Sequence, residues 1–210
     1  MTPEARRPTL DDQGPLDFRP LSGDRLGDLA EVFADGGDAR WCWCASFRVR
    51  GRDFGRSAER NRAVLERAAN RADSGAAEPP GLVAYRGGRA VGWVSLGPRA
   101  DYVRLAHSRV LAPVDDWPVW SIVCFVVARP ERGQGIGRAL LAAAIEFARE
   151  RGVATLEAYP LRDDQGRVGA AYAYCGTQAM FERAGFRVVE ARRMNRSTAP
   201  RPIMRLDLAR

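Results

Sequence analysis

The segment from Trp120 to Arg151 constrains the fold more than any other part of the chain. The apolar run from Trp120 to Ala128 is typical of a strand that is buried on both faces. It leads into Arg132-Gly133-Gln134-Gly135-Ile136-Gly137, and from Arg138 onward apolar residues recur at helical spacing. Alternating glycines let the backbone approach a ligand, and the free N–H groups of a helix start bind anions. The segment therefore predicts a strand, a phosphate-binding loop and a helix.

The remaining elements follow from shorter patterns. The stretch from Ala154 to Pro160 predicts a strand after the helix, and a strand–helix–strand crossover places its two strands parallel and adjacent. Gly87-Gly88 between the apolar runs 82–86 and 89–96 indicates a hairpin. Ser22 is expected to cap the first of the other helices. These lie at about 22–34, 57–71 and 170–184, with further strands at 16–21, 186–192 and 203–208.

Residues 16–210 are predicted to form a single domain, because no long linker divides them, and residues 1–15 to form a flexible N-terminal segment. No apolar run approaches the roughly 20 residues of a membrane helix. The polar N-terminus also lacks the apolar core of a signal peptide. We therefore expect a cytoplasmic protein without a membrane partner.

Charge and cysteine content limit the possible partners. The net charge is +7, from 33 basic and 26 acidic residues, and every basic side chain other than His107 is Arg. This charge is spread along the chain, so no nucleic-acid partner is expected, although +7 keeps nucleic-acid binding as an alternative. The cysteines lack the paired spacing of a zinc site, so no metal is expected. They are Cys42, Cys44, Cys124 and Cys175.

The spacing of the glycines separates this loop from two other phosphate loops. A Walker loop requires Lys, which the chain lacks, and a Rossmann loop requires G-x-G-x-x-G. Arg132-x-x-Gly135-x-Gly137, between an apolar strand and an amphipathic helix, resembles the acyl-CoA loop of the GNAT N-acetyltransferases. The segment Phe181-Glu182-Arg183-Ala184-Gly185-Phe186 resembles the closing segment of the same family.

This resemblance implies an α+β fold (α/β three-layer). Its central sheet would be mixed and mostly antiparallel, with a splayed parallel strand pair and helices on both faces. The implied function is an N-acetyltransferase that moves the acetyl group of acetyl-CoA, its co-substrate, to a primary amine of a small molecule or peptide. The amine would attack directly in a ternary complex. The alternative is a non-catalytic acyl-CoA-binding or sensing domain on the same fold.

The resemblance also assigns residues to the cofactor. The backbone N–H groups of the loop would hold the CoA pyrophosphate, the edge of the preceding strand would pair with the pantetheine amides, and the splay would admit the thioester. The cofactor-binding residues implied are Phe125, Val126, Val127, Arg132, Gly133, Gln134, Gly135, Ile136, Gly137, Arg138, Tyr159 and Phe181.

The groups that would move protons are less well marked. The family usually has Tyr where this chain has Phe181, and Phe cannot protonate the leaving thiolate. Tyr172, Tyr174 or Cys175 could replace it, or no dedicated acid is needed. The general base is Glu157, acting directly or through water, or else Asp101 or His107. An edge or solvent-facing carboxylate is the other interpretation of Glu157.

The acceptor is not identified by the sequence. The dense run from Trp41 to Phe47 is either a core plug or the apolar wall of an acceptor pocket, and 98–116 is predicted to be an irregular lid. The pocket residues expected are Trp41, Trp43, Cys44, Phe47 and His107. A cysteine nucleophile lacks a paired base in the sequence, which favours direct attack. A monomer and a homodimer both stay open.

Overall fold

The computed structural model describes residues 14–34, 38–55, 57–162 and 173–209, which are built around a mixed seven-stranded sheet. The strand order is β1-β2-β3-β4-β5-β7-β6, and only β4 and β5 are parallel neighbours, so the predicted crossover is confirmed. The strands are β1 (Leu16–Pro20), β2 (Gly81–Arg86), β3 (Arg89–Pro98), β4 (Trp120–Val127), β5 (Thr155–Ala158), β6 (Arg187–Arg192) and β7 (Arg201–Asp207).

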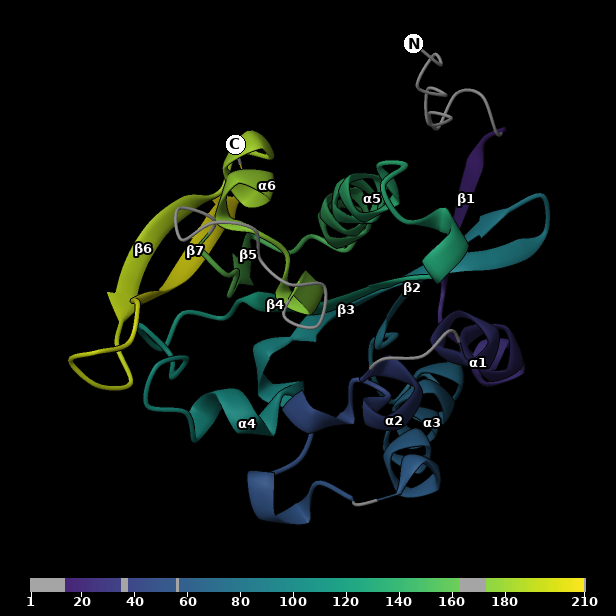
Figure 1. The fold of residues 1–210 in the computed structure, drawn as a ribbon, viewed down its shortest axis with the longest axis horizontal. Coiled ribbons are helices and arrows are strands. Elements are labelled where there is room, and N and C mark those ends of the chain that lie inside the picture. The colour runs from purple at the N-terminus through teal and green to yellow at the C-terminus, as the bar shows by residue number, and fades with distance from the viewer. Residues whose placement is uncertain (1–13, 35–37, 56, 163–172, 210) are drawn as a thin grey trace, which may run out of the picture.

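Helices cover both faces of this sheet (Figure 1). On one face, Leu29, Leu65 and Leu105 join one apolar core, and on the other, Leu140 and Phe181 join a second core. This three-layer arrangement confirms the predicted fold class. The first face carries α1 (Leu26–Ala34), α2 (Ala39–Cys42), α3 (Ala58–Asp73) and α4 (Val103–Ala106), and the second carries α5 (Ile136–Glu150) and α6 (Gln178–Arg183).

The parallel strands β4 and β5 are paired only over a short stretch. Their last paired residues are Ile122 and Ala158, where β5 ends, whereas β4 continues to Val127. At the same level, the register between β4 and β3 shifts by one residue at Val123. A bulge of this kind bends its strand. Here it lies at the point where the two strands separate, which confirms the predicted splay.

Local details differ from the sequence-based expectations. Helix α5 begins at Ile136, so the last two residues of the predicted loop belong to its first turn. The expected cap by Ser22 is wrong, because its hydroxyl bonds to Asp24 and the helix α1 begins only after a 3-10 turn, Gly23–Arg25. Ser57 is a true cap, whose hydroxyl accepts the N–H of Arg60. The predicted polar loop 163–169 lies outside the described residues.

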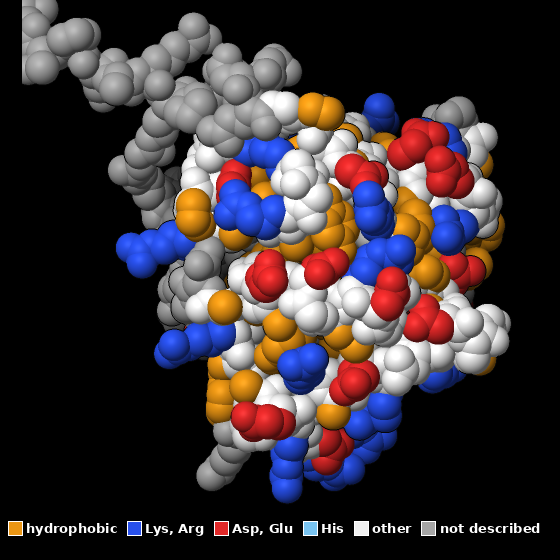
Figure 2. Space-filling model, turned by 90° about the vertical axis from the view of Figure 1, so that its right-hand side faces the viewer, with side chains coloured by type: hydrophobic (Ala, Val, Ile, Leu, Met, Phe, Trp, Pro, Cys, Tyr) orange, Lys and Arg blue, Asp and Glu red, His pale blue; other side chains and the backbone are white. Residues whose placement is uncertain are grey.

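The surface carries both signs of charge. On the face in Figure 2, Arg and Asp or Glu side chains are interspersed with apolar ones. Of the helices in the described ranges, none combines the length and the apolar composition needed to cross a membrane.

Candidate active site

The loop between β4 and α5 has the backbone conformation that its glycines predict. A 3-10 turn, Arg129–Glu131, leads into it, and Gly133 and Gly135 have left-handed φ values of 82° and 85°. Gly135 is also the N-cap of α5, where it offers no side chain to bond the first turn. A Cβ atom added to Gly137 would meet no atom within 4 Å. The N-terminus of this helix is therefore open.

The N–H groups of the loop are available to a ligand. Within the described part of the chain, no hydrogen bond engages the backbone N–H groups of residues 133–137, whereas those of Arg138 and Ala139 donate to the carbonyl of Gly135. The helix dipole adds a positive potential at the same place. The side chain of Arg138 begins there as well. These groups fit the pyrophosphate of a CoA molecule.

A buried carboxylate fastens the loop to the neighbouring hairpin. Glu131 is 5% exposed, and its Oε2 lies 2.8 Å from Nη1 of Arg86, while its Oε1 pairs with Arg89. Nη1 of Arg86 also donates to Oε1 of Gln134 at 2.7 Å. Because these two arginines flank the Gly87–Gly88 turn of the β2–β3 hairpin, the loop is held in place from outside its own sequence.

The splay leaves one edge of β4 without a partner strand next to this loop. Phe125, Val126 and Val127 follow the last residue of β4 that pairs with β5. The carbonyl of Val127 accepts a hydrogen bond from Nε of Arg132 at 3.0 Å, which ties the loop to the end of the strand. The structure thus places the predicted pantetheine edge and the predicted pyrophosphate loop in one continuous stretch.

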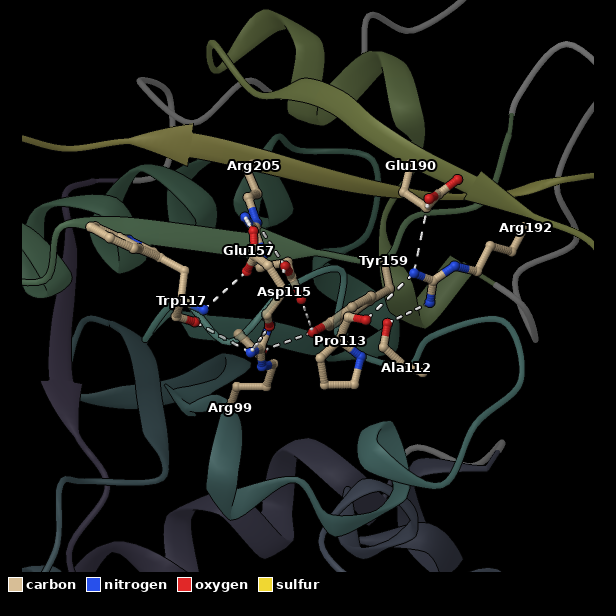
Figure 3. Close-up of polar contacts among 11 residues, drawn as sticks. Arg99, Ala112, Pro113, Asp115, Trp117, Glu157, Tyr159, Glu190, Arg192 and Arg205 are labelled. Carbon is tan, nitrogen blue, oxygen red and sulfur yellow. Dashed lines mark hydrogen bonds and ion pairs between the residues drawn. The ribbon is translucent and has the colours of Figure 1, made fainter.

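On the opposite face of the sheet, Glu157 and Tyr159 project from β5 and the residues that follow it (Figure 3). Glu157 is fully buried, so the solvent-facing interpretation is wrong. Its Oε1 accepts the phenol O–H of Tyr159 at 2.6 Å, and its Oε2 lies 2.8 Å from Nε of Arg205 and 3.6 Å from Nη1 of Arg99. Burial and the adjacent carboxylate raise the pKa of Tyr159 well above its usual value, so this phenol keeps its proton.

The same arginines hold the predicted lid (Figure 3). Arg205 makes two hydrogen bonds to the carboxylate of Asp115, at 2.7 and 2.8 Å, which lower the pKa of Asp115 to about 2. Arg99 donates to the backbone carbonyls of Asp115 and Trp117. Arg192, at the end of β6, donates to the carbonyls of two further lid residues, Ala112 and Pro113. The second half of the lid is therefore held by side chains of β6 and β7 and by Arg99 from the lid's own first turn.

Phe181, which stands where the family has Tyr, and the tyrosines predicted to replace it as the acid lie in different surroundings. Phe181 is fully buried in α6 and packs on Phe125 of β4, with ring centroids 6.1 Å apart. Tyr174 is 39% exposed, and its partial burial and the neighbouring thiol of Cys175 raise its pKa to about 12. Tyr172 lies outside the described residues. The 3-10 turn Ala173–Cys175 packs against β4, the strand that carries the predicted pantetheine edge. Tyr174 therefore stays a predicted acid.

Of the five residues predicted for the acceptor pocket, Trp43, Cys44 and Phe47 lie in one apolar core, whereas Trp41 and His107 lie outside it. Trp43 and Phe47 are buried in the core, the sulfur of Cys44 accepts a hydrogen bond from Nε1 of Trp93, and Trp41 is 41% exposed. His107 is exposed at the C-terminus of α4. Instead, an open cavity of about 300 Å³ is lined by both ends of the lid segment and by the residues just after it, and none of the five is among its lining residues. That lining includes Pro98, Arg99, Tyr102, Val103, Trp117 and Val119.

Sequence reasoning missed the two networks that support the site. The pairing of Glu131 with Arg86 and Arg89 had no visible signal, because some 42 to 45 residues separate the partners. The bond between Asp115 and Arg205 joins residues that are 90 positions apart. In a chain with so many arginines, nothing local marks these particular ones. Across the ranges that the structure covers, no group of three or more His, Cys, Asp or Glu side chains could hold a metal ion.

Comparisons with known proteins agree with this geometry. The acetyltransferase (GNAT) family profile matches residues 43–186, which is more than half of the chain. A search of curated proteins finds no match.

Solved structures share the fold at low sequence identity. PaiA N-acetyltransferase from Thermoplasma acidophilum, in complex with coenzyme A, is 16% identical with a TM-score of 0.51, over 92% of this chain and 99% of that one. YncA from Salmonella typhimurium, with acetyl-CoA, is 18% identical with a TM-score of 0.52, over 93% and 95%. The ribosomal-protein-alanine N-acetyltransferase from Brucella melitensis is 24% identical with a TM-score of 0.50, over 91% and 99%.

Proposed function

Because the chain belongs to the GNAT acetyltransferase family and uses acetyl-CoA as its co-substrate, we propose that it acetylates a primary amine of a small molecule or peptide. In this proposal the amine attacks the thioester directly in a ternary complex. The observation that carries the proposal is the open row of backbone N–H groups at 133–137, continuous with the unpaired edge of β4. The free cysteines of the described chain fit a reducing compartment, and we place the reaction in the cytoplasm.

The loop after β4 and the last residues of the strand divide the work. The N–H groups of the loop and the side chain of Arg138 bind phosphate oxygens, which fixes the position of the whole donor. The unpaired edge at Phe125 and Val126 offers backbone groups to the pantetheine amides. A backbone N–H at Val126 or Val127 would also polarise the acetyl carbonyl. Holding both reactants in one cleft supplies much of the rate without a covalent enzyme intermediate.

The proton of the amine has a route on the acceptor face of the sheet. Tyr159 stands at the end of β5, and its phenol already donates to Glu157 at 2.6 Å. The phenol oxygen could accept a proton from the amine while its own proton passes to the carboxylate. Glu157 would then be the base without touching the substrate, and Tyr159 would connect the two. Tyr174 is the proposed donor to the leaving thiolate.

The test is thiol release from acetyl-CoA over a panel of primary amines that includes amino acids, peptides with free N-termini and small aromatic amines. Gly135→Val should abolish release at low acetyl-CoA concentration, because it places a side chain at the open helix N-terminus. Gly152→Val is the matched control. Gly152 follows the same helix, has a left-handed φ of 67° and would bring an added Cβ within 4 Å of no other atom, so it suffers the same backbone strain.

Three outcomes separate the possibilities. Release that depends on an amine and is lost only in Gly135→Val supports the proposal. Equal loss in both glycine variants would mean that strain alone explains the effect and would count against the loop as the cofactor site. Calorimetric binding of acetyl-CoA with no turnover for any amine would instead support a non-catalytic acyl-CoA-binding domain, which Phe181 in place of Tyr favours.

A further inference from the structure

One arginine lies where three segments of the chain meet beside the splay. Arg201 is the first residue of β7, and its guanidinium donates to the backbone carbonyl of Tyr159 from Nε at 3.1 Å and from Nη2 at 2.8 Å. Nη2 also donates to the sulfur of Cys175 at 2.9 Å. Tyr159 follows β5, and Cys175 ends the 3-10 turn that packs against β4. A single side chain therefore links the end of β5 to a turn that contacts β4.

Two prolines explain why a side chain, and not the backbone, makes these bonds. The last pair between β5 and β7 is Ala158 opposite Met204. Two further steps in the same register would bring Pro160 opposite Pro202, and neither proline has an N–H group to donate. The ladder between the two strands ends before this pair. The guanidinium of Arg201 supplies two donors to the carbonyl of the intervening residue instead.

The chain beyond the first of these prolines pairs with a different segment. The N–H of Leu161 donates to the carbonyl of Gly176 at 3.1 Å, and the carbonyl of Leu161 accepts the N–H of Gln178 at 2.8 Å. Leu161 thereby forms a parallel bridge with Thr177. Because its backbone groups are used there, this part of the chain does not pair with β4, whose edge at 125–127 stays without a partner strand. The guanidinium joins the same two segments immediately before this bridge.

The two residues that Arg201 holds carry or adjoin the phenols of the proposed reaction. Tyr159 is held by its carbonyl, and its phenol donates to Glu157 at 2.6 Å. Cys175 adjoins Tyr174, the proposed donor to the leaving thiolate. Burial raises the pKa of Tyr174 to about 12, and the positive charge of Arg201 acts against this rise. Among the described residues no Asp or Glu pairs with Arg201, so no ion pair cancels its charge.

We propose that Arg201 is a positioning residue for acetyl transfer, which fixes the phenols of Tyr159 and Tyr174 relative to each other across the splay. Without its bonds, the turn that carries Tyr174 can shift against the end of β5. A shift of about 1 Å between reacting groups costs up to about 100-fold in rate. This inference rests on the proposed function, because that function assigns proton transfer to the two phenols.

The first test is the split between kcat and acetyl-CoA affinity in Arg201→Ala. We expect kcat to fall by roughly 10- to 100-fold, because the phenols lose their alignment. The Kd for acetyl-CoA, measured by calorimetry, should change by less than about twofold, because Glu131 holds the phosphate loop separately. A guanidinium salt, at concentrations that leave the circular dichroism unchanged, should raise kcat again by about fivefold or more, since the free ion can make the same bonds. Arg201→Lys should have an intermediate kcat, because an ammonium group is a donor without the planar fork.

Arg193→Ala is the matched control. Arg193 belongs to the turn between β6 and β7, and its Nη1 also donates to a backbone carbonyl, that of Thr198, at 3.1 Å. That bond stays within the turn. Its loss should leave kcat and acetyl-CoA affinity unchanged, and guanidinium should have no effect on this variant.

A second readout does not need turnover. Cys175 is 3% exposed, and its alkylation by iodoacetamide in the native protein can be followed by peptide mapping. The reaction should be at least about fivefold faster in Arg201→Ala, because the turn opens more often, and guanidinium should slow it again. If Arg201→Ala does not fold, Arg201→Lys carries the same measurements.

The outcomes separate this inference from the proposed function. An active wild type whose kcat is retained in Arg201→Ala would overturn the inference and leave the function standing. A lower kcat with an equal loss of acetyl-CoA affinity and no rescue by guanidinium would indicate a general structural defect and would also overturn it. A wild type that is inactive with every amine would overturn the function and the role of Arg201 in proton transfer with it, and the alkylation rates would then decide whether Arg201 holds the turn.

Discussion

The two sides of the central sheet hold their functional groups in different ways. On the side of α5, the proposed cofactor site consists of backbone: glycines, N–H groups without acceptors in the described chain and one open strand edge. On the side of α4, the groups are side chains that already bond one another, such as Glu157 with Tyr159 and Arg205. On the side of α5, unpaired backbone groups are available to a ligand. On the side of α4, bonds between side chains hold the groups in place.

This difference explains why the two sides respond differently to substitution. A backbone site is sensitive to an added Cβ atom and to the loss of the buried contacts that hold its loop. A side-chain network loses a defined bond with each substitution, and the loss spreads to every partner of that group. Variants that act on one side only can therefore test the comparison, and the expected effects differ in size.

The largest effect is expected where a buried side chain supports the backbone site. Glu131→Gln removes a carboxylate that is 5% exposed and that pairs with the buried side chain of Arg86, so the free energy of unfolding should fall by roughly 3 kcal/mol. Acetyl-CoA affinity should fall as well, because Glu131 leads into the loop. Arg89→Ala removes a partner of the same carboxylate that is 63% exposed, and should cost less than about 1 kcal/mol.

Urea denaturation and calorimetry with acetyl-CoA measure both quantities for these two variants. A loss of stability without a loss of affinity in Glu131→Gln would show that the loop keeps its shape without the hairpin. The backbone site would then need no support from side chains, and the contrast between the two sides of the sheet would be sharper.

The second effect tests the proton route on the acceptor side. Tyr159→Phe should lower kcat by about 100-fold, a size typical of general acid–base catalysis, because it removes the connection to Glu157. Ser121→Ala is the control. Its hydroxyl lies 2.9 Å from the same phenol, but removing it leaves the bond between Tyr159 and Glu157 intact.

Steady-state kinetics distinguish catalysis from packing here. Glu157→Gln should lower kcat like Tyr159→Phe, whereas Ser121→Ala should leave kcat close to the wild-type value. An unchanged kcat in Tyr159→Phe would refute the route and leave Glu157 as a structural partner of Arg99 and Arg205.

The same division, between backbone patterns and side-chain contacts, separates the features that the sequence predicts from those that it does not. The loop, the crossover and the splay could be predicted because glycine spacing and an apolar strand are local patterns with a direct backbone meaning. The clamp at Glu131 and the lid contacts of Arg205 depend on chain segments that only the folded sheet brings together. The expected pocket at 41–47 shows the limit, because aromatic density alone cannot distinguish a core from a cavity wall.

A smaller effect is expected from a single methyl group in the backbone site. Gly137→Ala should stabilise the fold by roughly 0.5 kcal/mol, because Gly137 lies in the first turn of α5 and a Cβ there meets no atom within 4 Å. The same methyl should raise the Kd for acetyl-CoA by about tenfold, since it intrudes where phosphate oxygens approach the backbone. Gly27→Ala is the control, because Gly27 occupies the second position of α1 with equal free space.

Gly27→Ala should raise the melting temperature and leave the Kd unchanged. If both variants have unchanged affinity, the ligand does not contact the first turn of α5. The phosphate position would then have to move toward Gly133.

The smallest effect is expected at the lid, where pH acts on an exposed ion pair. Arg205 lowers the pKa of Asp115 to about 2, below the roughly 3.9 of an unfolded Asp. A depressed pKa in the folded state means that the contribution to stability is complete above about pH 4 and is lost as pH falls toward 2. Because Asp115 is exposed, we expect a local release of the lid before global unfolding.

The fluorescence of Trp117 should report this release, because its backbone N–H bonds to the carboxylate of Asp115. Asp115→Asn should abolish the acid step, and Trp117→Phe should remove the signal. A step that persists in Asp115→Asn would assign the acid transition to another carboxylate and would show that the lid is held by Arg99 and Arg192 alone.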